Sequence, residues 1–98
     1  MSRLYSVKYN DVMQKIFIVE DDESIVTSLK LALSDEFSVV SALNFRAVVQ
    51  EITETHADLV LMDITLPYFN GFYWTTELRK ISKIPIIFIS SADDEMNQ

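Results

Sequence analysis

Residues 58–71, DLVLMDITLPYFNG, are the most informative segment of this sequence for its fold. Its first half, 58–63, is apolar inside and acidic at its end, which predicts a buried strand that finishes at Asp63. Pro67 and Gly71 exclude a regular element in the residues that follow. The stretch therefore predicts a strand that delivers a carboxylate to an irregular loop.

The segment after this loop, FYWTTELRKIS (72–82), has apolar residues four and three positions apart, which predicts a helix with one buried face. The predicted buried positions are Trp74, Leu78 and Ile81. Basic residues near its end suit the helix dipole. Pro85 stops this helix, and IIFIS (86–90) is predicted to be a strand.

The residues before position 58 show the same alternation of predicted strand and predicted helix. KIFIVE (15–20) and FSVVSA (37–42) are predicted strands, and β-branched and aromatic types dominate the first of them. DDES opens a helix that runs to about Ser34, and Asn44 is the predicted cap of the next one. The predicted buried faces of these two helices are Ile25, Leu29, Ala32 and Leu33, and Phe45, Val48, Val49 and Ile52.

The order strand, helix, strand, helix, strand, helix, strand predicts an α/β fold with parallel strands and right-handed crossovers. Three strands are apolar on both faces, whereas 37–42 carries serines and is the predicted edge. A flavodoxin-like, doubly wound sheet with strand order 2-1-3-4-5 fits best. An apolar fourth strand needs a neighbour, so we expect the fold to be cut off here before its fifth strand and helix. Residues 1–13 are interpreted as a leader, and 93–95 as the first turn of another helix.

Composition excludes several classes of function. The chain has 98 residues and no cysteine, one histidine (His56) and one glycine, so disulfides, thiolate zinc sites and glycine-rich nucleotide loops are excluded. Eight basic against 15 acidic residues give a net charge of −7, which argues against a nucleic-acid surface on this segment. No apolar run approaches the roughly 18 residues of a membrane span, so we expect no membrane insertion and a cytoplasmic location.

Carboxylates follow two neighbouring strands of the predicted sheet. Glu20, Asp21 and Asp22 follow the first strand, and Asp63 ends the third. Ligands of an open parallel sheet bind beyond the carboxyl ends of its strands, where these acids would meet and repel one another. Oxygen ligands alone favour Mg²⁺. Each acid taken singly is also explained as a helix cap or a loop solvator, and the joint placement is what favours a site.

Three blocks of the chain resemble the signature blocks of one family. KIFIVEDD, LVLMDITLPYFNGF and IPIIFISSADD are similar to the receiver domain of bacterial two-component response regulators, over residues 14–98. The subfamily resembles the OmpR/PhoB type, and LPYFNGFYW resembles regulators of antimicrobial-peptide resistance of the bacitracin and nisin type.

The resemblance implies a role for each matching residue. Asp63 would accept the phosphoryl group, and Asp21, with Glu20 acting through a water, would hold Mg²⁺. The backbone carbonyl of Thr65 would complete the protein ligands, and Ser90 would be the hydroxyl that starts the switch. The residues that would shape the neighbouring loop are Pro67 and Gly71.

The chain departs from the family pattern at two positions and stops before two others. Asn70 stands where the family usually has Asp, and Ser91 stands where a small residue such as Ala often follows the switch hydroxyl. The family's phosphoryl-binding lysine and switch aromatic belong to the fifth strand, and their positions would lie beyond Gln98.

The resemblance also implies partners. A sensor histidine kinase would supply the phosphoryl group, and the intact protein would form a homodimer. DNA would be bound only through a winged-helix domain expected beyond the chain. Such a protein catalyses its own phosphorylation and is not a metabolic enzyme.

The sequence also leaves room for other functions. A pseudo-receiver that binds partners without phosphorylation is the main alternative. A phosphatase of the haloacid-dehalogenase kind would need a D-x-D motif, whereas the first strand is followed by Glu20, Asp21 and Asp22. FMN binding would need a loop rich in hydroxyls and glycines at that place. His56 is interpreted as a helix-end residue, and Phe72 and Tyr73 are left open as a partner surface.

Overall fold

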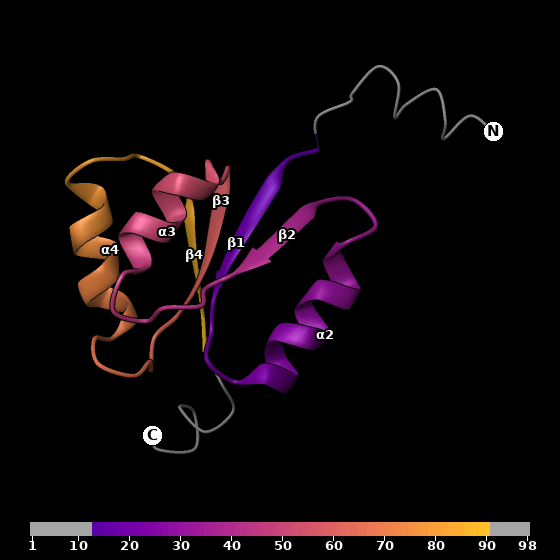
Figure 1. Cartoon of the computed structure of the whole chain (residues 1–98), viewed down its shortest axis with the longest axis horizontal. Helices are drawn as coiled ribbons and strands as arrows, with labels where there is room; N and C mark the ends of the chain where they lie inside the picture. The colour runs from indigo at the N-terminus through magenta and orange to yellow at the C-terminus, as the bar shows by residue number, and fades with distance from the viewer. Residues whose placement is uncertain (1–12, 91–98) are drawn as a thin grey trace.

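The computed structural model describes residues 13–90, which form a four-stranded parallel sheet with helices on both faces (Figure 1). The elements are β1 (Lys15–Val19), α2 (Glu23–Leu33), β2 (Ser38–Ser41), α3 (Val48–Thr55), β3 (Leu59–Asp63), α4 (Gly71–Arg79) and β4 (Ile86–Ile89). The strand order is β2-β1-β3-β4, and every pair is parallel. The predicted α/β class and the order of these four strands are confirmed.

Some predictions fall outside the part of the chain that the structure describes. They are the leader over residues 1–13, the residue after the switch hydroxyl (Ser91) and the helix start at 93–95. Of the leader, the structure describes only Met13. Within the described part, the predicted strands differ from the observed ones by one residue at one or both ends.

Two apolar layers enclose the sheet, with α2 on one face and α3 and α4 on the other (Figure 1). Successive side chains of a strand point to opposite faces. Ile16 and Ile18 of β1 accordingly pack with the α2 layer, whereas Phe17 and Val19 pack with α3 and α4. This confirms that β1 is buried on both faces, as a central parallel strand requires.

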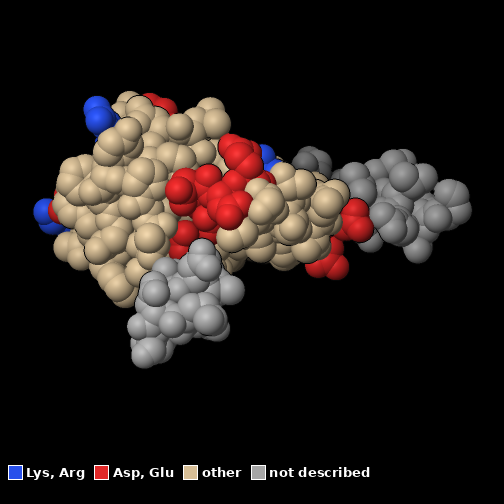
Figure 2. Space-filling view, turned by 90° about the horizontal axis from the view of Figure 1, so that it is seen from below, with Lys and Arg blue, Asp and Glu red and all other residues tan. Residues whose placement is uncertain are grey.

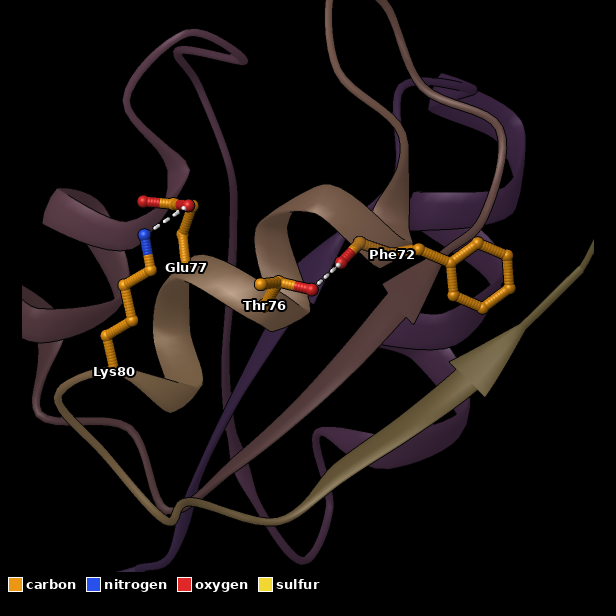
Figure 3. Close-up of polar contacts among 4 residues, drawn as sticks. All are labelled: Phe72, Thr76, Glu77 and Lys80. Carbon is orange, nitrogen blue, oxygen red and sulfur yellow. Dashed lines mark hydrogen bonds and ion pairs between the residues drawn. The ribbon is translucent and has the colours of Figure 1, made fainter.

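Strand β4 is apolar, as predicted, but its side chains are only partly buried. Ile87 is 52% exposed and Phe88 is 40% exposed, because no described element lies along the outer edge of β4. The rings of Phe88 and Phe72 lie 5.1 Å apart, and Figure 3 shows the Phe72 ring projecting from the start of α4 toward this strand. Burial therefore follows the position of a strand in the sheet as well as its composition.

Helix α4 begins at Gly71 because Asn70 caps it, its Oδ1 accepting a hydrogen bond from the Tyr73 amide at 2.9 Å. It ends at Arg79, earlier than predicted. Ile81 lies beyond that end and is 64% exposed, so its predicted place on the buried face is wrong.

Polar contacts on α4 lie on its exposed side (Figure 3). The Thr76 hydroxyl donates to the Phe72 carbonyl at 3.0 Å, and Lys80 pairs with Glu77 at 2.9 Å. An exposed pair of this kind is screened by solvent and adds little to stability. The buried residues Trp74 and Leu78 are what fix α4 to the core.

The predicted cap of α3 is also wrong. This helix begins at Val48 after Ala47, which makes no side-chain cap, and Asn44 instead accepts a hydrogen bond from the Arg46 amide at 2.9 Å. The loop is held from inside the helix, since Glu51 accepts hydrogen bonds from the amides of Leu43 and Asn44 at 3.0 Å each. The residue that joins the helix to the preceding loop by side-chain hydrogen bonds is therefore Glu51, and not Asn44 as predicted.

The remaining predictions for helical faces are mixed. Val48 and Ile52 are buried, and Phe45 packs against the same cluster from the loop before α3. In α2 the buried residue is Val26, whereas Ala32 is exposed, contrary to prediction. His56 caps the end of α3 in a left-handed conformation with φ 59°, in line with the predicted helix-end role.

Candidate functional site

Three carboxylates meet at the edge of the sheet where the strands end. Val19 of β1 pairs with Met62 of β3, so the next residues on the two strands, Glu20 and Asp63, lie beside one another. Ligand oxygens of Glu20, Asp21 and Asp63 all lie within 4.8 Å of one another. Figure 2, which looks onto this edge, shows acidic side chains gathered near the middle of the face. The predicted meeting of acids from two separate segments is confirmed.

Burial makes this cluster electrostatically costly. Glu20 is 4% exposed and Asp63 is 3% exposed, whereas Asp21 is open to solvent. The pKa of Glu20 is raised to about 7, chiefly by burial and also by the charge of Asp63, a hydrogen bond with it and the charge of Asp21. The Asp22 amide, which donates to Glu20 Oε2 at 3.0 Å, acts in the opposite direction. A cation at this place would remove the repulsion.

The donor set fits a magnesium ion. All three side chains offer carboxylate oxygens, and neither sulfur nor imidazole belongs to the cluster among the described residues. Hard cations such as Mg²⁺ prefer oxygen ligands and are commonly held by one or two carboxylates with waters. Glu20, Asp21 and Asp63 are therefore the side chains that would hold it.

Backbone hydrogen bonds hold the loop from β3 to α4, which follows Asp63 in the chain. The amide of Gly71 donates to the carbonyl of Ile64 at 2.8 Å, which closes the loop on itself. The amide of Phe69 donates to the carbonyl of Pro67 at 2.8 Å. Both predicted loop-shaping residues, Pro67 and Gly71, thus take part in the turns that return the chain to α4.

The structure places the two hydroxyl residues of the prediction at the same edge. Ser90 follows directly after Ile89, whose partner in the sheet is Asp63, and it is exposed. Thr65 lies two residues after Asp63 and is also exposed. The roles of Ser90 as the switch hydroxyl and of the Thr65 carbonyl as a metal ligand stay predictions.

One contact between two loops was missed by sequence reasoning. The guanidinium of Arg46 lies 4.2 Å from the centre of the Tyr68 ring, and Tyr68 has a left-handed backbone with φ 71°. This cation–π contact joins the loop before α3 to the loop before α4. No pattern in the sequence signals a contact between two loops that are distant along the chain.

No helix among residues 13–90 is both long and apolar enough to cross a membrane.

Comparison with known proteins agrees with this site. The family model of the response regulator receiver domain matches residues 16–98. The response regulator protein GraR of Staphylococcus haemolyticus is 39% identical over 85 residues, which are 86% of this chain and 38% of GraR. The transcriptional regulatory protein YvcP of Bacillus subtilis is 46% identical over 87 residues, 88% of this chain and 37% of YvcP. The chain thus spans less than two fifths of the length of these relatives.

A solved structure carries the likeness into three dimensions. It is the N-terminal domain of the nisin resistance regulator NsrR, a lantibiotic response regulator. The two are 64% identical with a TM-score of 0.78, and the match covers 87% of this chain and 73% of that one. Fold, acidic edge and sequence likeness agree, and the chain belongs to the receiver domain family of response regulators.

Proposed function

We propose that Asp63 accepts a phosphoryl group from a sensor histidine kinase in a Mg²⁺-dependent reaction. The observation that carries this proposal is the meeting of Glu20, Asp21 and Asp63 at one edge of the sheet. A receiver domain is a signalling module rather than a metabolic enzyme, and its product here is the phosphorylated protein itself.

Phosphoryl transfer to Asp63 involves a single covalent step on the protein. A carboxylate oxygen of Asp63 attacks the phosphorus of a phosphohistidine, an O–P bond forms, and the P–N bond breaks to release the histidine. The attack brings two anions together, so positioning and charge neutralisation are the main catalytic demands. Bound Mg²⁺ would supply the neutralising charge. Glu20 and Asp21 would hold the ion, and the carbonyl of Thr65 would complete the protein ligands.

The response to phosphorylation would begin at Ser90. A phosphoryl group adds negative charge and acceptor oxygens to Asp63. Ser90 follows Ile89, the residue that pairs with Asp63, and its hydroxyl would be drawn toward those oxygens. Its movement would shift the residues after β4, which is a two-state switch biased by a covalent change.

The downstream role rests on the relatives. We propose that residues 14–98 are the receiver part of a longer cytoplasmic regulator, which dimerises and binds DNA through a winged-helix domain outside this chain. YvcP is named a transcriptional regulatory protein and NsrR a nisin resistance regulator. Control of genes for resistance to antimicrobial peptides is therefore the proposed output.

Labelling with a small phosphodonor tests the proposal. The chain, incubated with acetyl phosphate and Mg²⁺, is expected to gain one phosphoryl group by intact-protein mass spectrometry, and chelation by EDTA should prevent the gain. Asp63→Asn should abolish it, whereas Asp35→Asn, an exposed carboxyl on the turn after α2, should not. A wild-type protein that stays unlabelled but still binds its partners would instead be a phosphorylation-independent interaction module.

A further inference from the structure

The first turn of α2 is held by one residue, Asp22, directly beside the acidic cluster. Its Oδ1 accepts hydrogen bonds from the Ser24 amide at 2.9 Å, the Ser24 hydroxyl at 2.7 Å and the Ile25 amide at 3.3 Å. Its backbone is extended, with φ −83° and ψ 112°, as an N-cap requires. The conformation of Asp22 is therefore fixed by its own side chain.

The backbone of the same residue reaches into the site. The Asp22 amide donates to Glu20 Oε2 at 3.0 Å, and its carbonyl accepts from the Val26 amide at 3.0 Å. Glu20 is almost fully buried, and this hydrogen bond, together with the one that Glu20 makes with Asp63, orients its carboxylate. The helix cap and the orientation of a candidate metal ligand are thus two consequences of one local conformation.

We infer that Asp22 is a positioning residue for the metal site: by capping α2 it holds its own amide against Glu20 and keeps Glu20 and Asp21 in place to bind a divalent cation together with Asp63. Asp22 is outside the group of carboxylates that could share an ion, which is Glu20, Asp21 and Asp63, and its Oδ1 accepts hydrogen bonds from the first turn of the helix. The inference rests on the proposed function, because it assigns a task within the proposed Mg²⁺ site.

Loss of the cap should weaken the cation site without removing any ligand. Without the side-chain oxygen, the residues between β1 and α2 sample more conformations, and binding a cation must then order them. Groups that hydrogen-bond to metal ligands without touching the metal typically change metal affinity by 10-fold to 100-fold when they are removed. For an exposed cap we expect the lower end of that range.

A pair of substitutions separates capping from charge. Asp22→Ala and Asp22→Asn both remove one negative charge near the site, but Asn caps helices about as well as Asp. By isothermal titration calorimetry at fixed ionic strength, Asp22→Ala should bind Mg²⁺ about tenfold more weakly than Asp22→Asn. Equal affinities of the two variants would overturn the inference, because the deficit would then be purely electrostatic.

A second readout does not depend on the metal. Hydrogen exchange of the amide at position 22, followed by NMR in metal-free protein, should be faster in Asp22→Ala than in Asp22→Asn, because this amide would no longer be held against Glu20. Val26→Ala, which destabilises the same helix from its buried face, should leave the Mg²⁺ affinity near that of the wild type. If Val26→Ala weakens binding as much as Asp22→Ala does, general helix stability explains the effect and the inference fails.

The result for the wild-type chain distinguishes this inference from the proposed function. A wild-type chain that binds no Mg²⁺ overturns the proposed function, and the positioning role falls with it. A wild-type chain that binds Mg²⁺, with Asp22→Ala equal to Asp22→Asn, overturns the positioning role alone.

Discussion

Gly71 packs directly against the backbone of Asp63. A Cβ atom at Gly71 would overlap the carbonyl oxygen of Asp63 and would also meet Met62 Cγ at 3.0 Å. The first turn of α4 can therefore approach the end of β3 only because position 71 has no side chain. The contact is steric, since the backbone of Gly71 has no positive φ.

Gly71→Ala is expected to destabilise the protein and to disturb the acidic edge. The new methyl group must push α4 away from β3, and overpacking of this kind costs about 1–3 kcal/mol. Chemical denaturation followed by circular dichroism would measure the loss, and the NMR signals of Asp63 should shift. Thr76→Ala, on the exposed side of the same helix, is the control. An unchanged midpoint for Gly71→Ala would show that the close approach is not needed.

Asn70 is expected to stabilise α4 as its N-cap. Asn70→Ala removes the acceptor for the Tyr73 amide and should lower the free energy of unfolding by about 1 kcal/mol. Asn70→Asp keeps the cap and should be close to the wild type. Thermal unfolding of the three proteins would check this order, and a destabilised Asn70→Asp would contradict it.

The elements that sequence reasoning predicted correctly are those that local patterns determine. Asp63 could be placed because a parallel sheet brings the carboxyl ends of its strands to one edge, which needs no detailed geometry. The prediction for Asn44 is wrong because an Asx turn and an N-cap have the same local sequence signature. The hydrogen bonds that Glu51 accepts from the preceding loop distinguish the two, and they depend on tertiary geometry. Ile81 was predicted to be buried because it continues the helical spacing of Trp74 and Leu78, but α4 ends at Arg79, before this residue.

Tertiary relationships account for the rest. The exposure of Ile87 and Phe88 depends on what lies beside β4, which apolar composition alone does not reveal. The contact of Arg46 with Tyr68 depends on how the fold brings together two loops that are distant along the chain. The link from Asp22 to Glu20 depends on the exact direction of one amide.

The metal-free protein is expected to lose stability as the pH rises from about 4.5 to about 7. The folded protein holds the pKa of Glu20 near 7, above the ordinary value of 4.5, so it binds more protons than the unfolded chain in this window. Unfolding therefore becomes easier as the pH rises through this window. Urea denaturation in EDTA at several pH values would measure the slope.

Glu20→Gln should remove most of this pH dependence and make the metal-free protein more stable above pH 7, because the buried charge is gone. Glu36→Gln is the matched control, since it removes an equal charge from the exposed turn after α2. A wild-type slope retained in Glu20→Gln would assign the effect to another group.

The affinity for Mg²⁺ is expected to fall as the pH drops below about 7, in the opposite sense to the stability of the metal-free protein. Glu20 must lose its proton to serve as a ligand, and its pKa near 7 means that a cation competes with protons at lower pH. Calorimetry in two buffers of different ionisation enthalpy at pH 6.5 should show proton release on binding. At saturating Mg²⁺ the destabilising slope between pH 4.5 and 7 should flatten, since the cation favours the ionised cluster and stabilises the folded state that binds it. Binding that is independent of pH across this range would mean that Asp21 and Asp63 hold the ion without Glu20.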